Sequence, residues 1–430
     1  MQKRITLALL PILAVVLTAC TLADLPVIGR FFGGSSGGET TITGDPVAIT
    51  FWGLWENPSV INALIAKYQE QHPNVTINYD DRSVLDPLEY KERAFTRATE
   101  ETGPDIMRVH VSWVPRLRGS LTTVPTNLIT PEAFNTTYYP VASQNMVFDG
   151  KVYGYPAYYD GLVLVYNLDH FAEVGQQSAP TAWEEFRRLA IELTVEGDRN
   201  TITRAGAAIG AADNIDFFSD ILGLLFSQAS VSMPDGIDGR PAQDALTFYT
   251  NFVTEDKVWS PSFPEATTAF VQGNVSMMFV PTWILLDILQ NNPELNIGVA
   301  PVPQALPDNP ASWASFWVDV VPQSSKNQAV AWDFLNFMNQ EEQQLLLFSE
   351  ASRVRPFGAP YSRVSLSSEL ASNPYIKPAL DTASIAKTYE IAARAGNRRQ
   401  VDALKAAVNS LLSGGSAEEA LKAAKAEIAR

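Results

Sequence analysis

The segment 47–109 alternates between strand and helix patterns, and this alternation constrains the fold more than any other feature of the chain. The stretches with the residue pattern of a strand are 47–52, 75–79 and 105–109. Two helix patterns lie between them and begin at Asn57-Pro58 and Asp86-Pro87, pairs that are typical of a helix N-cap and first turn. Strands that alternate with helices in this way predict a mostly parallel sheet, and hence an α/β fold.

The loops that follow the first and third of these strands carry aromatic and polar side chains. In open parallel sheets, ligands lie beyond the carboxyl ends of the strands. Trp55 and Glu56 fall in the first loop, and Ser112 and Trp113 fall in the second. An indole ring offers a flat apolar face and a single N–H donor. We therefore expect both loops to contribute to a ligand site.

Residues 47–430 are too many for one hydrophobic core, so two domains are expected. The chain has a single cysteine, which excludes an intramolecular disulfide, and 46% of its residues are hydrophobic. Stability therefore has to come from packed apolar cores and not from covalent cross-links.

The N-terminus has the features of an export signal. Lys3 and Arg4 precede an apolar run at 5–17 that is too short to cross a bilayer as a helix. The run leads into Leu-Thr-Ala-Cys, which ends at Cys20 and resembles a bacterial lipobox, the motif whose cysteine is lipidated. The alternative is an ordinary signal peptide with a chance cysteine. We expect residues 1–19 to be the signal peptide and Cys20 to carry the lipid.

Residues 20–46 are predicted to form a flexible tether, because the stretch Gly-Gly-Ser-Ser-Gly-Gly at 33–38 and the polar residues after it cannot pack a core. The same stretch contains the pattern Gly-x-Ser-x-Gly of serine hydrolases. That motif requires a strand before it and a helix after it, and neither is predicted here, so we reject the match.

Charge and histidine placement exclude several classes of partner. The formal net charge is −16 and no basic run follows the signal, so nucleic acid is not an expected partner. His72, His110 and His170 are far apart and lack metal-ligand spacing. We therefore expect no metal and no other cofactor.

Several stretches along the chain form a recognisable set. They are Ile49-Thr50-Phe51-Trp52 with Gln71-His72-Pro73-Asn74-Val75, Gly103-Pro104-Asp105-Ile106, Gly150-Lys151-Val152-Tyr153-Gly154-x-Pro156 with Val165-Tyr166-Asn167, Pro180-Thr181-x-Trp183-x-Glu185-Phe186, and Leu412-Ser413-Gly414-Gly415-Ser416-Ala417-Glu418-Glu419-Ala420-Leu421. In their order and spacing they resemble the extracellular solute-binding protein family of bacterial sugar ABC importers, the group that includes maltose-binding protein. The resemblance covers nearly the whole chain after the tether.

This resemblance implies a two-lobe α/β architecture, the type II periplasmic-binding-protein-like fold, with a ligand cleft between lobes that are joined by hinge strands. The expected N-terminal lobe comprises residues 47–157 and 282–335. The expected C-terminal lobe comprises residues 158–281 and 336–430.

The resemblance also implies where the cleft residues lie. Carried over by position, they fall on Trp55, Glu56, Ser112, Trp113, Tyr158, Asp160 and Trp283. Where the family has a glycine pair before a strand, this chain has Phe316 and Trp317, which suggests an extra stacking platform or a smaller pocket. Arg355 lies near a loop where the family has a Pro-Pro-Arg-like motif, although the residue order differs here.

Alternative roles remain open for most of these residues. Trp55, Trp113 and Trp283 could stack on a ligand or pack in the core, and Glu56 and Asp160 could cap a helix or pair with an arginine. Tyr158 and its neighbour point to opposite faces if the hinge is extended, so one of the two reaches the ligand.

The function implied by the resemblance is that of a non-enzymatic, lipid-anchored, extracytoplasmic protein. It would capture a mono- or oligosaccharide and deliver it to an ABC permease with a separate cytoplasmic ATPase, and it would act as a monomer held to the membrane by its lipid alone. A glycan-active enzyme using Glu56 and Asp160, or a glycan receptor without a transporter, is the alternative.

Overall fold

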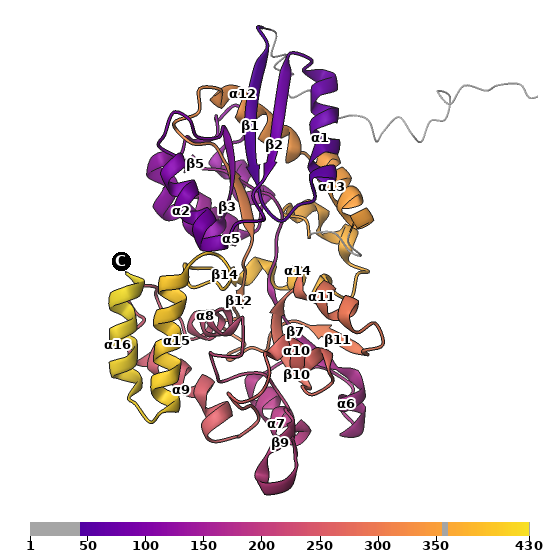
Figure 1. Ribbon diagram of the computed structural model, residues 1–430, viewed down its shortest axis with the longest axis vertical. Helices are drawn as coiled ribbons and strands as arrows, with labels where there is room; N and C mark the ends of the chain where they lie inside the picture. Colours follow the sequence, from indigo (N-terminus) through magenta and orange to yellow (C-terminus); the bar gives the residue numbers. More distant parts are fainter. Residues whose placement is uncertain (1–43, 355–359, 430) are drawn as a thin grey trace, which may run out of the picture. The chain divides into compact units, whose positions relative to one another are not determined.

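The computed structural model describes residues 44–354 and 360–429, the side chain of Asn200 excepted. Cys20, the predicted signal peptide, most of the predicted tether and Arg355 lie outside the described residues. Two main sheets organise the described part of the chain, and helices pack around each of them (Figure 1).

The first sheet contains the parallel strands that the sequence predicts. It has the order β2-β1-β3-β13-β6, with β1 (Val47–Gly53), β2 (Val75–Asp81), β3 (Ile106–His110), β13 (Trp317–Val320) and β6 (Tyr155–Pro156). Both β2 and β3 pair with β1 in parallel, whereas β13 is antiparallel to β3 and to β6. The predicted parallel arrangement is confirmed, and β13 adds a strand from far along the chain.

The two helices between these strands begin where the sequence predicts. α1 (Pro58–Gln71) follows Asn57 and α2 (Pro87–Arg97) follows Asp86, and each of these side chains accepts a hydrogen bond from a backbone N–H of the first turn. Such caps satisfy N–H groups that have no partner inside the helix. The buried face of α1 consists of Val60, Ile61, Leu64, Ile65 and Tyr68.

Two late helices, α12 (Gln328–Met338) and α13 (Glu341–Val354), pack against α1 (Figure 1). The remaining elements near the first sheet are η2 (Val111–Trp113), α3 (Val114–Leu117), η3 (Arg118–Ser120), α4 (Pro131–Thr137), α5 (Pro140–Met146), β4 (Val147–Phe148) and β5 (Lys151–Val152), where η denotes a 3₁₀ helix. The first sheet is thus completed by segments from both halves of the chain.

The central strand of the second sheet is β7 (Leu162–Asn167), all of which is buried. β10 (Met277–Pro281) and β11 (Ile297–Ala300) flank it, and both run antiparallel to it. α11 (Ile284–Asn291) connects the two outer strands. The segment from β10 to β11 therefore forms one crossover unit around β7.

Helices from distant parts of the chain pack beside the second sheet. α8 (Phe218–Gln228), α9 (Arg240–Thr254), α15 (Arg398–Leu412) and α16 (Ala417–Ile428) contact one another. The other elements are α6 (Leu168–Glu173), α7 (Trp183–Leu193), β8 (Val195–Glu196), η4 (Asp198–Asn200), β9 (Ile202–Arg204), α10 (Ala266–Val271), β12 (Ser312–Trp313), η5 (Val364–Leu370), α14 (Lys377–Asp381), η6 (Ala383–Ile385) and β14 (Ala386–Lys387).

The chain passes between the two sheets at places that differ in part from the boundaries expected from sequence. The passage from β6 to β7 falls at the expected boundary after residue 157. The expected return at residue 282 is wrong, because β11 pairs with β7 and the chain rejoins the first sheet only at β13. The expected boundary after residue 335 is wrong as well, since α13, which lies beyond that boundary, packs against α1.

A glycine lies where β11 pairs with β7. Gly298 in β11 lies beside the ring of Tyr166 in β7, and a Cβ atom at Gly298 would come within 2.2 Å of that ring. A larger residue at this position would force the Tyr166 ring to move, so glycine suits the pairing. The turn Pro281-Thr282-Trp283 leads from β10 into α11 and does not leave the sheet.

Candidate functional site

A cleft with a volume of about 770 Å³ lies between elements of the two sheets. From the first sheet it receives the loop after β1 and the facing ends of β3 and β13. From the second it receives the residues after β10, the start of α8 and the segment that leads into α15. A ligand in this cleft would contact both sides of the molecule at once.

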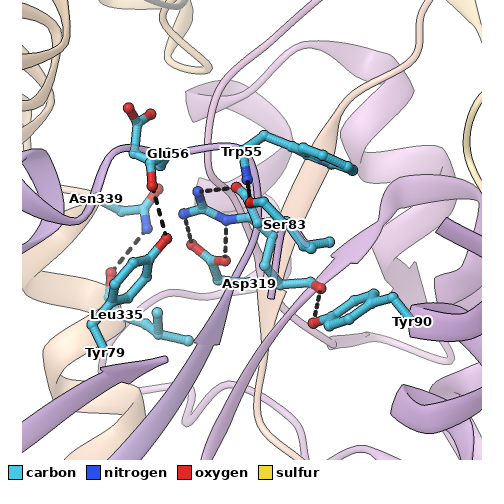
Figure 2. Close-up of polar contacts among 10 residues, drawn as sticks. Trp55, Glu56, Tyr79, Ser83, Tyr90, Asp319, Leu335 and Asn339 are labelled. Carbon is cyan, nitrogen blue, oxygen red and sulfur yellow. Dashed lines mark hydrogen bonds and ion pairs between the residues drawn. The ribbon is translucent and has the colours of Figure 1, made fainter. Parts of the chain in front are cut away.

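Trp55 forms an aromatic wall of the cleft together with Trp317. Trp55 has a backbone φ of 60° and a side chain that is 41% exposed. Its ring centroid lies 6.2 Å from that of Trp317. The backbone N–H of Trp55 donates a hydrogen bond of 2.7 Å to Ser83 (Figure 2). The Ser83 hydroxyl in turn donates to Asp81. A left-handed backbone is rare for a bulky residue, and such outliers cluster at functional sites.

A buried ion pair supports the loop that carries Trp55. The Arg108 guanidinium donates to both oxygens of Asp319, at 2.9 and 3.0 Å, and both side chains are 1% exposed. Burial alone would disfavour the charge on Arg108, but the Asp319 carboxylate more than offsets this cost and raises the pKa of the guanidinium. Arg108 also donates to the carbonyl of Leu54, and its own carbonyl accepts from the Tyr90 hydroxyl (Figure 2).

A second aromatic wall belongs to the other side of the cleft. Trp283, at the start of α11, is 37% exposed and lies edge-on to Phe217 with ring centroids 5.9 Å apart. The Arg394 guanidinium lies 5.4 Å from the Phe217 ring and 5.6 Å from the Trp283 ring. Arg394 also forms an ion pair with Asp216. This wall therefore consists of aromatic faces held in place by a cation.

Two buried aspartates line the cleft. Asp160, which is 3% exposed, accepts hydrogen bonds from the N–H of Gly161 and from the N–H and hydroxyl of Thr282, at 2.7 to 3.0 Å. Asp220, which is 2% exposed, accepts from the Trp313 indole at 2.7 Å and from the backbone N–H of Ala393 at 2.9 Å.

Burial is the main influence on the ionisation of both carboxyls. It raises the pKa of Asp160 to about 6, against the opposing effect of the hydrogen bonds from Thr282. It raises the pKa of Asp220 to about 7, and the charge of Asp160 adds to that shift. The two carboxylates are therefore close enough to influence each other.

A chain of hydrogen bonds runs from the cleft towards α2. His110 contacts the hydroxyls of Ser315 at 3.1 Å and Ser112 at 2.8 Å. Asn397 donates to Ser112 at 3.3 Å and accepts from the Lys91 ammonium at 2.7 Å. Burial lowers the pKa of His110 to about 3, and the nearby Lys91 charge adds to the effect, so this imidazole is neutral at physiological pH.

The segment 390–398 connects elements of both sheets. On the first-sheet side, Glu390 forms an ion pair of 2.6 Å with Arg116, and the Ala395 carbonyl accepts from the Trp113 indole at 2.8 Å. On the second-sheet side, the backbone N–H of Ala393 donates a hydrogen bond to the carboxylate of Asp220 in α8. Gly396 has a φ of 64°, and a Cβ atom there would lie 2.5 Å from the carbonyl oxygen of Pro87. Glycine is therefore required at this position.

Five of the residues predicted from sequence come together in the cleft. They are Trp55, Tyr158, Asp160, Trp283 and Trp317. Their roles as ligand contacts remain predictions, but each lines the same cavity and they come from both of its sides.

Four of the other predicted residues, Glu56, Ser112, Trp113 and Phe316, do not line the cleft. Trp113 is fully buried and Ser112 is bonded inside the protein, because the chain turns into η2 directly after β3 and carries both inward. Glu56 is also buried, and its backbone carbonyl accepts from the Tyr79 hydroxyl (Figure 2). Phe316 is buried against Tyr159. Arg355 lies outside the described residues.

Several lining residues were not predicted from the sequence. Asp220 and Phe217 lie at the start of α8, and Arg394 and Asn397 lie in the segment before α15. The one available signal was Asp220 itself, the single charged residue in the mostly apolar stretch 217–226. A carboxylate at a buried helix position indicates a specific partner or a ligand. Arg394 gives no comparable signal.

Neither a metal cluster nor a membrane-spanning helix is found in the described part of the chain. No group of three or more His, Cys, Asp or Glu side chains among residues 44–354 and 360–429 is arranged to hold a metal ion. Within the same residues, every helix is too short or too polar to cross a bilayer.

Comparison with known proteins agrees with this architecture. The family model for bacterial extracellular solute-binding proteins matches residues 63–378. A binding protein of Brucella abortus (strain 2308) is 22% identical over 283 residues, which are 64% of this chain and 67% of the relative.

Solved structures of similar fold cover most of the chain. The cyclic α-maltosyl-1,6-maltose binding protein of Arthrobacter globiformis has a TM-score of 0.71 and 20% identity, over 89% of this chain and 98% of that one. A sugar-binding protein of Xanthomonas citri has a TM-score of 0.70 and 19% identity, over 89% and 96%. The predicted two-lobe type II fold is thereby confirmed. The chain belongs to the family of bacterial extracellular solute-binding proteins.

Proposed function

We propose that the protein captures a carbohydrate in the cleft between its two sheets and delivers it to the permease of an ABC importer. The observation that carries this proposal is the pair of aromatic walls, Trp55 with Trp317 and Trp283 with Phe217, on opposite sides of one cavity. The faces of a sugar ring carry apolar C–H groups, which stack on indole rings, while its hydroxyls need hydrogen-bonding partners.

The polar groups between the walls suit such a ligand. The Asp160 and Asp220 carboxylates are acceptors for hydroxyl groups, and the Arg394 guanidinium is a donor. The cavity volume of about 770 Å³ falls in the ordinary range for small-molecule sites, roughly 300–1,000 Å³. Apolar platforms combined with a few placed polar groups are the expected design of a saccharide site.

Membership of a family of extracellular solute-binding proteins supports the proposed delivery to a permease. The similar proteins of Arthrobacter globiformis and Xanthomonas citri are described as binding proteins for a cyclic maltosyl saccharide and for sugar. We propose the same class of ligand here, with Cys20 as the lipid attachment point and the monomer as the working form. A separate subunit would supply ATP hydrolysis.

The proposed role is that of a carrier and not of an enzyme. A glycosidase using Glu56 and Asp160 would need both carboxylates beside the scissile bond, about 5 to 9.5 Å apart. Asp160 lines the cleft, whereas Glu56 does not. The carboxylate pair considered from the sequence is therefore not assembled in the cleft.

A thermal-shift screen of mono- and oligosaccharides on the soluble body tests the proposal, because a ligand that binds the folded state raises its melting temperature. Hits are then titrated by calorimetry against wild type, Trp283→Ala and, as a control at a half-buried aromatic residue outside the cleft, Phe148→Ala. Stabilisation by a saccharide that is lost in Trp283→Ala is the expected result. Release of new reducing ends from the bound saccharide would contradict the carrier role.

A further inference from the structure

Asp160 and Asp220 share an unusual property among the carboxylates of the cleft. Both are almost completely buried, and every hydrogen bond that they accept comes from a neutral N–H or O–H group. In the part of the chain that the structure describes, neither forms an ion pair. Buried carboxylates in proteins are normally paired with a cation, because an unpaired buried charge is costly.

The cations that line the cleft are already matched with other acids. Arg394 pairs with Asp216, and Arg398 lies 3.7 Å from the Asp86 carboxylate. The Lys91 ammonium does not line the cleft, and it donates a hydrogen bond to Asn397. The positive charges near the cleft thus do not neutralise the two buried aspartates.

The charges of the residues that line the cleft add to the shortage of cations around Asp160 and Asp220. The aspartates in the lining are Asp86, Asp160, Asp220, Asp287 and Asp402, and the only arginine or lysine residues among the described lining are Arg394 and Arg398. The whole chain is also acidic, with a formal charge of −16. A cleft with this excess of negative charge attracts cationic ligands and repels anionic ones.

The aromatic walls favour a cation as well. A ring face carries negative charge density, so a positive group between Trp55 and Trp283 would be stabilised by the same rings that stack on a sugar. Arg394 already lies over Phe217 and Trp283 in this manner. The cleft therefore offers both partners that an ammonium group requires, aromatic faces and buried carboxylates.

We propose that the saccharide carried by this protein bears a free amine, and that its ammonium group supplies the counter-charge for Asp160 and Asp220. This inference rests on the proposed carbohydrate function and specifies the chemical class of the ligand. The sugar ring lies against the indoles, and the amine is directed towards the carboxylates. An acetylated or hydroxylated analogue would leave both carboxylates without a cation.

Calorimetric titration at neutral pH with three probes of equal length tests the inference. The probes are the glucosamine trisaccharide with free amines, its fully N-acetylated form, and neutral maltotriose. Hydrogen bonds between charged groups are stronger than those between neutral groups, so the free-amine probe should bind at least about ten-fold more tightly than the acetylated form. In Asp160→Asn and Asp220→Asn this preference should disappear.

Asp256→Asn is the matched control. The Asp256 carboxylate is 6% exposed and is paired with Arg187, and Asp256 does not line the cleft. This variant removes the same charge from the protein and should keep the preference for the amine. Melting temperatures show whether each variant folds, and the comparison of probes on wild type needs no variant.

Three results would overturn the inference. Equal binding of the free-amine and acetylated probes by wild type would exclude the amine and leave the carbohydrate function standing. A preference that survives in both Asn variants would show that these carboxylates do not provide it. Failure of every saccharide, combined with binding of a non-sugar amine such as spermidine, would refute the carbohydrate function itself and the inference with it.

Discussion

Replacement of Asp319 by Asn should destabilise the protein far more than the loss of an exposed ion pair. Asp319 lies in β13 and holds Arg108 of β3 through two hydrogen bonds of 2.9 and 3.0 Å. The pair therefore joins a late segment of the chain to the strands formed by residues 47–110. It also positions the guanidinium that donates to the Leu54 carbonyl, immediately before the strained backbone of Trp55.

The size of the effect follows from burial. Both side chains are 1% exposed, so the Asn variant leaves a buried guanidinium without its counter-charge. Removal of one partner from such a pair costs about 3 to 5 kcal/mol. Glu89 and Arg93 form an ion pair on the surface of α2, with side chains that are about half exposed. Loss of that pair should cost only about 0.3 to 0.5 kcal/mol.

Urea unfolding of wild type, Asp319→Asn and Glu89→Gln, followed by circular dichroism, measures the difference. We expect a much lower unfolding midpoint for Asp319→Asn and little change for Glu89→Gln, with similar slopes in all three proteins. If the two variants lose the same small amount of stability, the ion pair does not hold the sheet together as described.

Three further outcomes are expected. Trp55→Ala should weaken saccharide binding by about 1 to 3 kcal/mol in calorimetric titration and leave the melting temperature almost unchanged. Trp113→Ala should instead destabilise folding by about 3 to 5 kcal/mol. The reverse pattern would mean that Trp113 contacts the ligand and Trp55 supports the fold. The pKa of Asp220 is raised from 3.8 to about 7. Between these two pH values the folded state holds a proton that the unfolded chain has lost, so the stability contributed by this group falls as the pH rises from 3.8 to about 7. In Asp220→Asn, the free energy of unfolding measured by urea titration at several pH values should fall less with rising pH than in wild type. An unchanged dependence on pH would contradict the raised pKa of Asp220. Cys20→Ser should release the protein from the membrane fraction, and continued acylation would disprove the lipobox.

The parts of the fold that depend on local pattern could be predicted from the sequence. The strand and helix order of 47–109 and the helix starts after Asn57 and Asp86 are all visible in short windows of residues. The return of β13 to the first sheet is different, because the pairing of Trp317 with His110 joins residues that are far apart in the chain. No local pattern specifies such a partner.

The same distinction separates the predicted cleft residues from the missed ones. Trp55 and Trp283 follow strands, and a strand end places a side chain near the sheet edge. Trp113 also follows a strand, but the turn of η2 rotates it into the interior, where a carbonyl from residue 395 accepts its N–H. Asp220 lies on a helix whose orientation is set by tertiary contacts, so its place in the cleft could not be predicted from the strand pattern.

The double attachment of segment 390–398 has a consequence for the rate at which a ligand could leave the cleft. This segment is bonded to Arg116 and Trp113 on one side and to Asp220 on the other. If the two sides move apart, at least one of these sets of bonds must break, whichever side the segment follows. We expect the energy of that rupture to add to the barrier for ligand dissociation, so the dwell time of the ligand would depend in part on Arg116, Trp113 and Glu390, which do not line the cleft.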